Sequence, residues 1–173
     1  MVLAMNVQGV VVASPIGELR IFVDDAGRLL RLGLPDPTLA NDPMPRSRAG
    51  DRCQHVVRQL AEYFAGERRT FDLELAPRGT PFQLRAWRAL AAIPFGATRT
   101  YQQQAIAIGN GNAMRAVGGA NGRNPIAIVV PCHRVIGKDG SLTGFGGGLS
   151  CKKWLLDHEA AVLARGARQA ANA

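Results

Sequence analysis

The sequence predicts an α/β protein with two parts, a small N-terminal domain of strands and one helix and then a mostly helical C-terminal domain. The chain has 173 residues, 47% hydrophobic and 20% charged, which is enough to bury two small cores. Strand-type patterning gives way to helix-type patterning near residues 77–81. The charge balance changes at the same place, because residues 1–80 carry ten Arg and ten acidic residues, whereas residues 81–173 carry eleven Lys or Arg and three acidic residues. We expect an N-terminal domain at 1–78, a C-terminal domain at 79–165 and a disordered tail at 166–173.

The beginning of the chain predicts an antiparallel meander. Three segments rich in Val, Ile and Leu are separated by the turn sequences Pro15-Ile16-Gly17 and Asp25-Ala26-Gly27. These expected strands are residues 7–13, 18–24 and 29–34. Prolines then interrupt every regular pattern, so residues 35–50 are expected to form a surface loop.

One helix and one further strand are expected in the rest of the N-terminal half. Apolar residues recur every three or four positions over 52–65, which predicts an amphipathic helix that ends at Gly66. Phe71, Leu73 and Leu75 alternate with polar residues, and this alternation predicts a strand.

The C-terminal half predicts a helix-turn-helix pattern after a first helix. Thr80 before Pro81 is typical of an N-cap followed by proline at the first helical position, and Pro94-Phe95-Gly96 ends that helix. Thr100 and Asn112 are expected to cap two short helices across a glycine-containing turn. These two helices are expected at residues 101–108 and 113–121.

The distribution of charge indicates a polyanionic partner. No acidic residue occurs between Glu74 and Asp139, and the window between them contains eight basic residues. They are Arg78, Arg85, Arg88, Arg99, Arg115, Arg123, Arg134 and Lys138. Nucleic acid is the leading candidate, and a solvated basic face without a partner is the alternative.

Other classes of protein are disfavoured. No apolar run is long enough for a membrane helix, and the start of the chain lacks the pattern of a signal peptide, so we expect a cytoplasmic protein with no membrane partner. Cys53, Cys132 and Cys151 are an odd number without C-x-x-C spacing, which supports neither a disulfide framework nor a zinc site. We expect no metal and no cofactor.

One of these cysteines has the surroundings of a nucleophile. The apolar run 125–131, bracketed by prolines, predicts a short buried strand that ends at Cys132-His133-Arg134. An imidazole and a guanidinium beside a thiol favour the reactive thiolate. A purely structural Cys-His pair is the alternative.

The final helix, expected from residue 150 to about residue 163, supplies a third group. Leu155, Leu156, Val162 and Leu163 predict its apolar face, and Glu159 lies three or four positions from each of them. A carboxylate on that face needs a hydrogen-bonding partner, for which His133 is the best candidate. Cys132, His133 and Glu159 would then be a nucleophile, a base and an orienting group, with a water bridging His133 to the sulfur. The alternative for Glu159 is a boundary position with its carboxylate in solvent.

Short segments in order over residues 80–160 identify a family. They are Ile93-Pro94-Phe95-Gly96, Thr100-Tyr101, Arg115-Ala116-Val117-Gly118, Asn124-Pro125, Pro131-Cys132-His133-Arg134-Val135-Ile136, Gly147-Gly148-Leu149 and Trp154-Leu155-Leu156. This pattern resembles the O6-alkylguanine-DNA alkyltransferases, also called methylated-DNA–protein-cysteine methyltransferases. The resemblance implies a ribonuclease-H-like N-terminal domain and a winged helix-turn-helix C-terminal domain. It also implies irreversible, single-turnover transfer of an alkyl group from O6-alkylguanine in DNA, and more weakly from O4-alkylthymine, to Cys132.

The resemblance implies further roles residue by residue. His133 would relay the thiol proton, Glu159 would orient His133, Tyr101 would donate to the guanine ring and Asn124 would organise the turns of the site. The substrate pocket would be formed by Val135, Phe145, Gly146 and Gly147. Double-stranded DNA would be bound through its minor groove, without sequence preference and with the damaged nucleotide flipped out. The DNA-contacting residues would be Arg115, which fills the vacated stack, with Tyr101, Ala116, Gly118, Gly119 and Arg123.

The sequence departs from the family pattern at three places. Gln102 replaces a frequent glycine, Asn110-Gly111 replaces a turn with proline, and Phe145 replaces a frequent tyrosine. Because Phe145 lacks a hydroxyl and Gly146 stands in place of a larger residue, we expect the pocket to accept adducts larger than methyl.

The alternative function is a non-catalytic alkylated-DNA binding protein. A helix-turn-helix regulator and a cysteine hydrolase are further alternatives, and no obligate protein partner is predicted.

Overall fold

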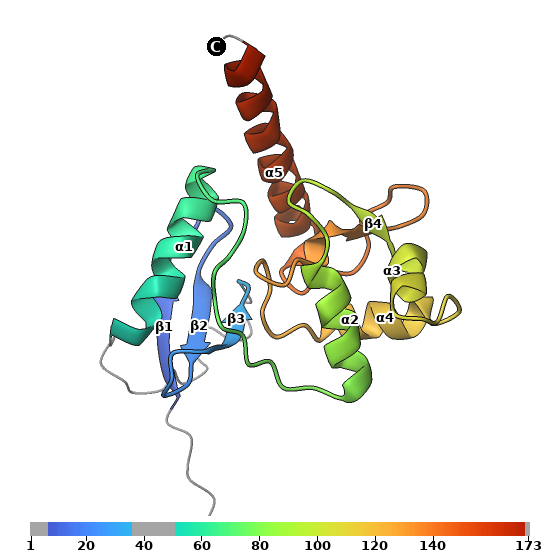
Figure 1. The fold of residues 1–173 in the computed structure, drawn as a ribbon, viewed down its shortest axis with the longest axis horizontal. Coiled ribbons are helices and arrows are strands. Elements are labelled where there is room, and N and C mark those ends of the chain that lie inside the picture. The colour runs from blue at the N-terminus through green and yellow to red at the C-terminus, as the bar shows by residue number, and fades with distance from the viewer. Residues whose placement is uncertain (1–6, 36–50, 172–173) are drawn as a thin grey trace, which may run out of the picture. The chain divides into compact units, whose positions relative to one another are not determined.

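Alternating apolar residues place a three-stranded sheet at the start of the chain. In the computed structural model, which describes residues 7–35 and 51–171, β1 (Gln8–Val12), β2 (Leu19–Val23) and β3 (Leu29–Gly33) are antiparallel in the order β1-β2-β3 (Figure 1). Alternate residues of β2 are buried, and the register with β3 shifts after Phe22. The predicted meander is confirmed. The loop expected at 35–50 lies, apart from its first residue, outside the described residues.

A helix covers this sheet. The short helix η2 (Asp51–Cys53) leads into α1 (Gln54–Ala65), which lies along the sheet in Figure 1 and buries Val56, Leu60 and Tyr63. Gly66 ends α1 in the left-handed conformation at φ 78°, as predicted.

The strand expected at 71–75 is wrong, because the structure has only an isolated bridge there, between Leu75 and Leu29. The reason is a side chain that replaces a strand partner. Gln59 of α1 donates to the carbonyl of Asp72 at 2.7 Å and accepts from its N–H at 2.8 Å. The backbone groups of Asp72 are therefore satisfied without a neighbouring strand.

The contacts divide the chain into two compact units, residues 1–79 with 125–127 and residues 80–124 with 128–173. Residues 125–127 belong to the first unit because Leu32 of β3 donates to the Pro125 carbonyl at 2.9 Å and accepts from the Ala127 N–H at 3.2 Å. The buried strand expected over 125–131 is wrong beyond this bridge. Ile128 has φ 70°, which breaks an extended run, and proline at each end of the run removes a donor. Ile126, Ala127, Ile128 and Val130 are nevertheless buried, as expected, and Val129 is partly buried.

The second unit begins with two well-capped helices. α2 (Pro81–Ala91) and α3 (Tyr101–Ala107) each start with a capping box, in which Thr80 pairs with Gln83 and Thr100 with Gln103. α4 (Met114–Gly122) follows, so the predicted helix-turn-helix pattern is present. The expected cap at Asn112 is wrong, because Ala113 is the N-cap residue and the side chain of Asn110 accepts from the Asn112 N–H at 3.2 Å.

Buried polar contacts fix these helices against one another. Trp87 of α2 donates through Nε1 to the Ala120 carbonyl of α4 at 2.9 Å. Gln104 of α3 and Asn121 of α4 exchange amide hydrogen bonds of 3.0 and 2.7 Å. The orientation of α4 is therefore set by directional bonds as well as by packing.

The last helix is longer than expected. α5 runs from Gly148 to Ala171, so residues 166–171 are helical in the structure, where a disordered tail was expected (Figure 1). Its final turns are rich in alanine, which has the highest helix propensity and extends the helix without packing. Within the described part of the chain, no helix is both long and apolar enough to span a membrane.

Candidate active site

The segment that carries the candidate nucleophile is a single tight turn in the second unit. Cys132, His133 and Arg134 form the short helix η3 (Cys132–Arg134), and all three are buried. β5 (Val135–Ile136) follows directly and pairs in parallel with β4 (Arg99–Thr100), a pair that the sequence patterns did not predict. Because β4 ends where α3 begins, this parallel pairing places the start of α3, at Tyr101, beside the end of β5.

His133 and Glu159 form the buried pair that the helix periodicity suggested. Both side chains are fully buried, and Nε2 of His133 lies 2.9 Å from Oε1 of Glu159. The alternative of a solvent-exposed carboxylate is therefore wrong. Glu159 also accepts from the backbone N–H of Gly96 at 2.8 Å.

Arg134 is the main partner of this carboxylate, and the sequence reasoning missed that role. Its Nε lies 3.0 Å from Oε2 of Glu159 and its Nη2 lies 2.8 Å from Oε1, while Nη1 donates to the Ile93 carbonyl at 2.6 Å. The guanidinium also lies over the ring of Phe95. The carboxylate thus accepts hydrogen bonds from three different residues and has an adjacent counter-ion.

These contacts set the protonation states of the pair. Burial acts to raise the pKa of Glu159, but the hydrogen bonds that it accepts from His133 and Arg134 and the positive charge of Arg134 lower it to about 2. Burial lowers the pKa of His133 against the opposing effect of Glu159. A neutral His133 beside an ionised carboxylate carries its proton on Nε2, which leaves Nδ1 as an acceptor. Among the described residues, this buried Nδ1 has no hydrogen-bond partner.

Cys132 lies in a setting that both opposes and favours its ionisation. Burial raises the pKa of the thiol, whereas a hydrogen bond from the Asn124 side chain and the charge of Lys152 act to lower it. Asn124 also donates to the Val130 carbonyl at 2.7 Å, which holds the approach to the turn. Cys53 and Cys151 are buried thiols whose pKa values are raised by burial, with Cys151 at about 11.

The expected pocket residues follow the turn on one loop and on β5. Val135 is buried, Phe145 and Gly147 are half-buried, and Gly146 is exposed with open space where a Cβ would lie. Tyr101 reaches this loop, since its hydroxyl donates to the Thr143 carbonyl at 3.2 Å. A Cβ on Gly118 would lie 3.7 Å from the Tyr101 ring, an ordinary van der Waals contact, so α4 passes beside this ring.

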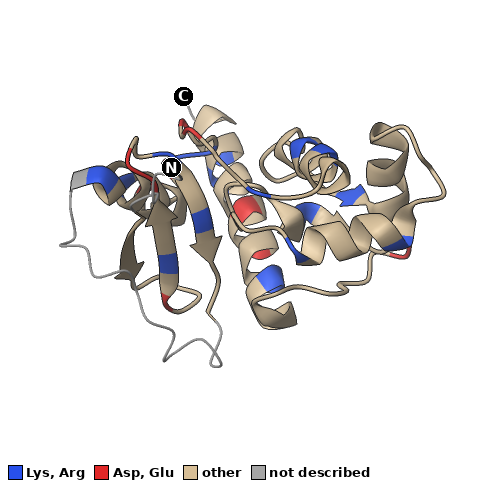
Figure 2. Ribbon diagram, turned by 90° about the horizontal axis from the view of Figure 1, so that it is seen from below, with Lys and Arg blue, Asp and Glu red and all other residues tan. Residues whose placement is uncertain are grey.

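Of the residues expected to contact DNA, Tyr101 begins α3 and the others lie on α4 and just beyond it. Arg115, Ala116 and Arg123 are exposed, and Gly118 and Gly119 are partly exposed. Arg123 folds back on the helix, donating to the Gly119 carbonyl at 3.1 Å. Figure 2 shows Lys and Arg on several helices and loops of the second unit, where Asp and Glu mark few positions. Arg134 and Lys152 are buried and do not belong to this basic surface.

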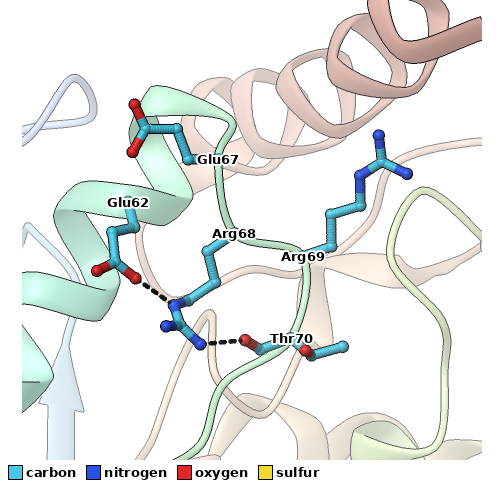
Figure 3. Close-up of a pocket in the computed structure, with 5 residues that line it drawn as sticks. All are labelled: Glu62, Glu67, Arg68, Arg69 and Thr70. Atoms are coloured by element: carbon cyan, nitrogen blue, oxygen red, sulfur yellow. Dashed lines mark hydrogen bonds and ion pairs between the residues drawn. The ribbon is translucent and has the colours of Figure 1, made fainter.

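A hollow in the first unit has different chemistry. It is lined by Glu62, Glu67, Arg68, Arg69 and Thr70, and none of the predicted site residues lines it (Figure 3). Arg68 donates to Glu62 at 2.6 Å and to the Thr70 carbonyl at 2.9 Å, so its charge is already paired. In the described ranges, no group of three or more His, Cys, Asp or Glu residues could hold a metal ion.

Comparison with known protein families identifies the family of the chain. Residues 81–161 match the DNA binding domain of 6-O-methylguanine DNA methyltransferase, and residues 10–77 match the ribonuclease-like domain of the same family. The chain belongs to this family. The methyltransferase family membership and the sheet-plus-helices architecture confirm the predicted fold class and the resemblance.

Individual methyltransferases align over nearly the whole chain. The methylated-DNA–protein-cysteine methyltransferase of Methanosarcina acetivorans is 47% identical over 154 residues, which cover 84% of this chain and 94% of the relative. The crystal structure of Mycobacterium tuberculosis O6-methylguanine methyltransferase has a TM-score of 0.79 and 45% identity, covering 90% of this chain and 93% of that one. A structure of Mycobacterium tuberculosis OGT in complex with DNA has a TM-score of 0.80 and 47% identity, covering 88% and 92%.

Two buried cations of this methyltransferase site were missed by the sequence reasoning, though a signal for one was available. Lys152 lies seven residues before Glu159, so both are on the face of α5 that buries Leu155 and Val162. The periodicity that predicted a buried carboxylate therefore also indicates a buried lysine, which was not predicted above. No comparable periodicity singles out Arg134 as the partner of Glu159.

Proposed function

We propose that this chain repairs alkylated DNA by transferring the alkyl group from O6 of guanine, and more weakly from O4 of thymine, to Sγ of Cys132. The observation that carries the proposal is the buried Nδ1 of His133, left as an acceptor because Nε2 is committed to Glu159. A proton relay from a thiol requires a nearby group that can accept the proton, and His133 directly follows Cys132 in the chain.

The reaction then follows from the site. A bridging water passes the Cys132 proton to Nδ1 of His133, and Glu159 stabilises the imidazolium that forms. The thiolate attacks the alkyl carbon, so the S–C bond forms as the C–O6 bond breaks and its electron pair moves to the guanine. The guanine is protonated as it leaves, with Tyr101 donating to the ring. The thioether has no good leaving group, so each molecule reacts once.

Access to O6 requires the nucleotide to leave the duplex, at a cost of a few kcal/mol. We propose that α4 enters the minor groove, where Ala116, Gly118 and Gly119 permit close approach of the backbone. Arg115, exposed at the start of α4, would fill the vacated stack, and Arg123 would contact the phosphates. Binding through phosphates and shape has no sequence preference, as repair of scattered lesions needs.

The pocket would be completed by the loop after β5. Val135, Phe145, Gly146 and Gly147 lie on β5 and this loop, with Asn124 holding the chain before the turn. The open space beside Gly146 supports acceptance of adducts larger than methyl. The reaction needs a reduced thiol and no cofactor, which fits a cytoplasmic location.

The test is intact and peptide mass spectrometry after mixing the protein with a duplex that contains O6-methylguanine. We expect one methyl group per molecule, confined to the peptide with Cys132, while the peptides with Cys53 and Cys151 stay unmodified. Cys132→Ser is the control that should remain unmodified and still bind the duplex. An unmodified wild-type protein that binds the lesion would overturn alkyl transfer and indicate a damage-binding protein.

The mode of DNA binding is tested by the fluorescence of 2-aminopurine paired beside the lesion, which rises when stacking is lost. Arg115→Ala should weaken both binding and this rise. Arg58→Ala, which removes an exposed arginine of α1 in the first unit, is the matched control and should change neither. Equal effects of the two variants would refute the role of Arg115.

A further inference from the structure

Lys152 is buried where a lysine is rarely found. Its side chain on α5 is fully buried, and Nζ donates to the Val135 carbonyl at 2.6 Å and to the Thr143 carbonyl at 3.0 Å. Lysine is almost never fully buried unless it is paired, because an ammonium loses its hydration there. Within the described ranges, no carboxylate lies within ion-pair distance of Nζ.

The two carbonyls belong to the walls of the proposed pocket. Val135 is the first residue after the turn that carries Cys132, and Thr143 lies on the loop that leads to Phe145 and Gly146. The Thr143 carbonyl also accepts from the Tyr101 hydroxyl, and Nζ of Lys152 lies 6.0 Å from the centre of the Tyr101 ring. One ammonium group thus ties α5, β5, the pocket loop and the start of α3 together.

The positive charge of Lys152 can stabilise an anion at Cys132, whereas the charge of Arg134 is already paired. Arg134 is neutralised by Glu159, whereas the acceptors of Lys152 in the part of the chain that the structure describes are two neutral carbonyls. Ionisation of Cys132 creates an anion that interacts electrostatically with Lys152. The Cys132 thiolate therefore has Lys152 as a counter-ion, whereas the neutral thiol of the resting site has no charge for Lys152 to balance.

We propose that Lys152 is a positioning residue that holds the Val135 and Thr143 carbonyls around the pocket and balances the charge of the Cys132 thiolate. The role of the pocket rests on the function proposed above, but the effect on the thiol does not. The groups that act on the Cys132 thiol are the Asn124 side chain, the backbone N–H groups of the turn itself, and Cys151 and Lys152 on α5. Glu159, Arg134 and Lys152 act on the imidazole of His133.

The experiment measures the thiol without DNA. Wild-type protein and Lys152→Met are treated with iodoacetamide at pH values from about 5 to 10, and the rate at the Cys132 peptide is followed by mass spectrometry. We expect the apparent pKa of Cys132 in the variant to rise by about 1 or more, with a rate at neutral pH about tenfold lower. Lys153→Met is the matched control, because it removes an exposed lysine one position away that pairs with Asp157, and its profile should equal wild type.

Two further variants separate charge from packing. Lys152→Arg keeps the positive charge and should retain most of the wild-type pH profile, whereas Lys152→Gln keeps a donor without charge and should resemble Lys152→Met. Near-ultraviolet circular dichroism checks that each variant is folded. A folded Lys152→Gln or Lys152→Met with the wild-type profile would overturn the proposal, and so would a Lys152→Arg profile as altered as that of Lys152→Gln.

The result is independent of the proposed repair reaction. If the wild-type protein fails to take methyl from DNA while Lys152→Met still shifts the iodoacetamide profile, the repair function falls and the role of Lys152 in thiol ionisation stands. If methyl transfer occurs normally and the profile does not shift, the repair function stands and the role of Lys152 falls.

Discussion

Replacing Glu159 by Gln should strongly destabilise the second unit. The substitution keeps the size of the side chain, so it creates no cavity, but it removes the charge that faces Arg134. An amide also presents donor hydrogens where the Gly96 N–H, Arg134 and His133 all donate. Removing one partner of a buried pair leaves the other uncompensated, at a cost of about 3–5 kcal/mol.

The measurement is urea unfolding followed by tryptophan fluorescence, since both tryptophans of the chain, Trp87 and Trp154, belong to the second unit. Lys153→Met is the control, because its pair with Asp157 is exposed and should contribute less than about 1 kcal/mol. A double variant with Arg134→Met should lose less than the sum of the single losses, by about 2 kcal/mol.

A Glu159→Gln protein no less stable than the Lys153→Met control would refute this reasoning. Strict additivity with Arg134→Met would refute it as well, because the two groups would then not act on each other in the folded state.

Three other changes have defined outcomes. The pKa of Glu159 is about 2 in the folded chain against an ordinary 4.5, so its contribution is present above pH 4.5 and is lost as pH falls towards 2; urea midpoints measured down this range should fall more steeply for wild type than for Glu159→Gln. Gly96→Ala should lower the free energy of unfolding by about 1–2 kcal/mol, because Gly96 has φ 74° and the new Cβ would fall on the Leu163 side chain. Adding Leu163→Ala should recover only the steric part of this loss. An unchanged urea midpoint for Gly96→Ala would contradict this. Gln104→Leu leaves the buried amide of Asn121 without its partner and should cost about 1–3 kcal/mol by urea unfolding, whereas changing both residues to Leu should cost less than Gln104→Leu alone; a larger loss in the double variant would contradict the paired amide network.

Local signals predicted most of the elements, because the physics that forms them is local. The alternation in β2, the capping boxes at Thr80 and Thr100, and the glycine after α1 each involve residues within a few positions of one another. The burial of Glu159 was likewise available from the spacing of apolar residues along one helix. At these helix ends and turns, which are decided by neighbours in sequence, the prediction and the structure agree.

The wrong predictions have tertiary or competing local causes. The strand at 71–75 is replaced by contacts from Gln59, thirteen positions before Asp72, and the run after Asn124 is bent by the left-handed Ile128. Asn112 loses its cap role to the neighbouring turn made by Asn110. Arg134 was not assigned to Glu159 because the spacing of apolar residues on α5 marks Glu159 as buried but does not say which side chains of the segment Cys132-His133-Arg134 face it.

The excursion of residues 125–127 limits how this chain can be cut or recombined. A fragment that begins at Thr80 would carry this segment without β3, so Ile126 would lose its burial and two backbone hydrogen bonds would lose their partners. The segment lies between Asn124 and Cys132, so the part of the chain that leads to the Cys132 thiol would lose these contacts. The boundary near residue 79 therefore does not divide the chain into two exchangeable modules. A chimaera made within this family should exchange β3 and residues 125–127 together.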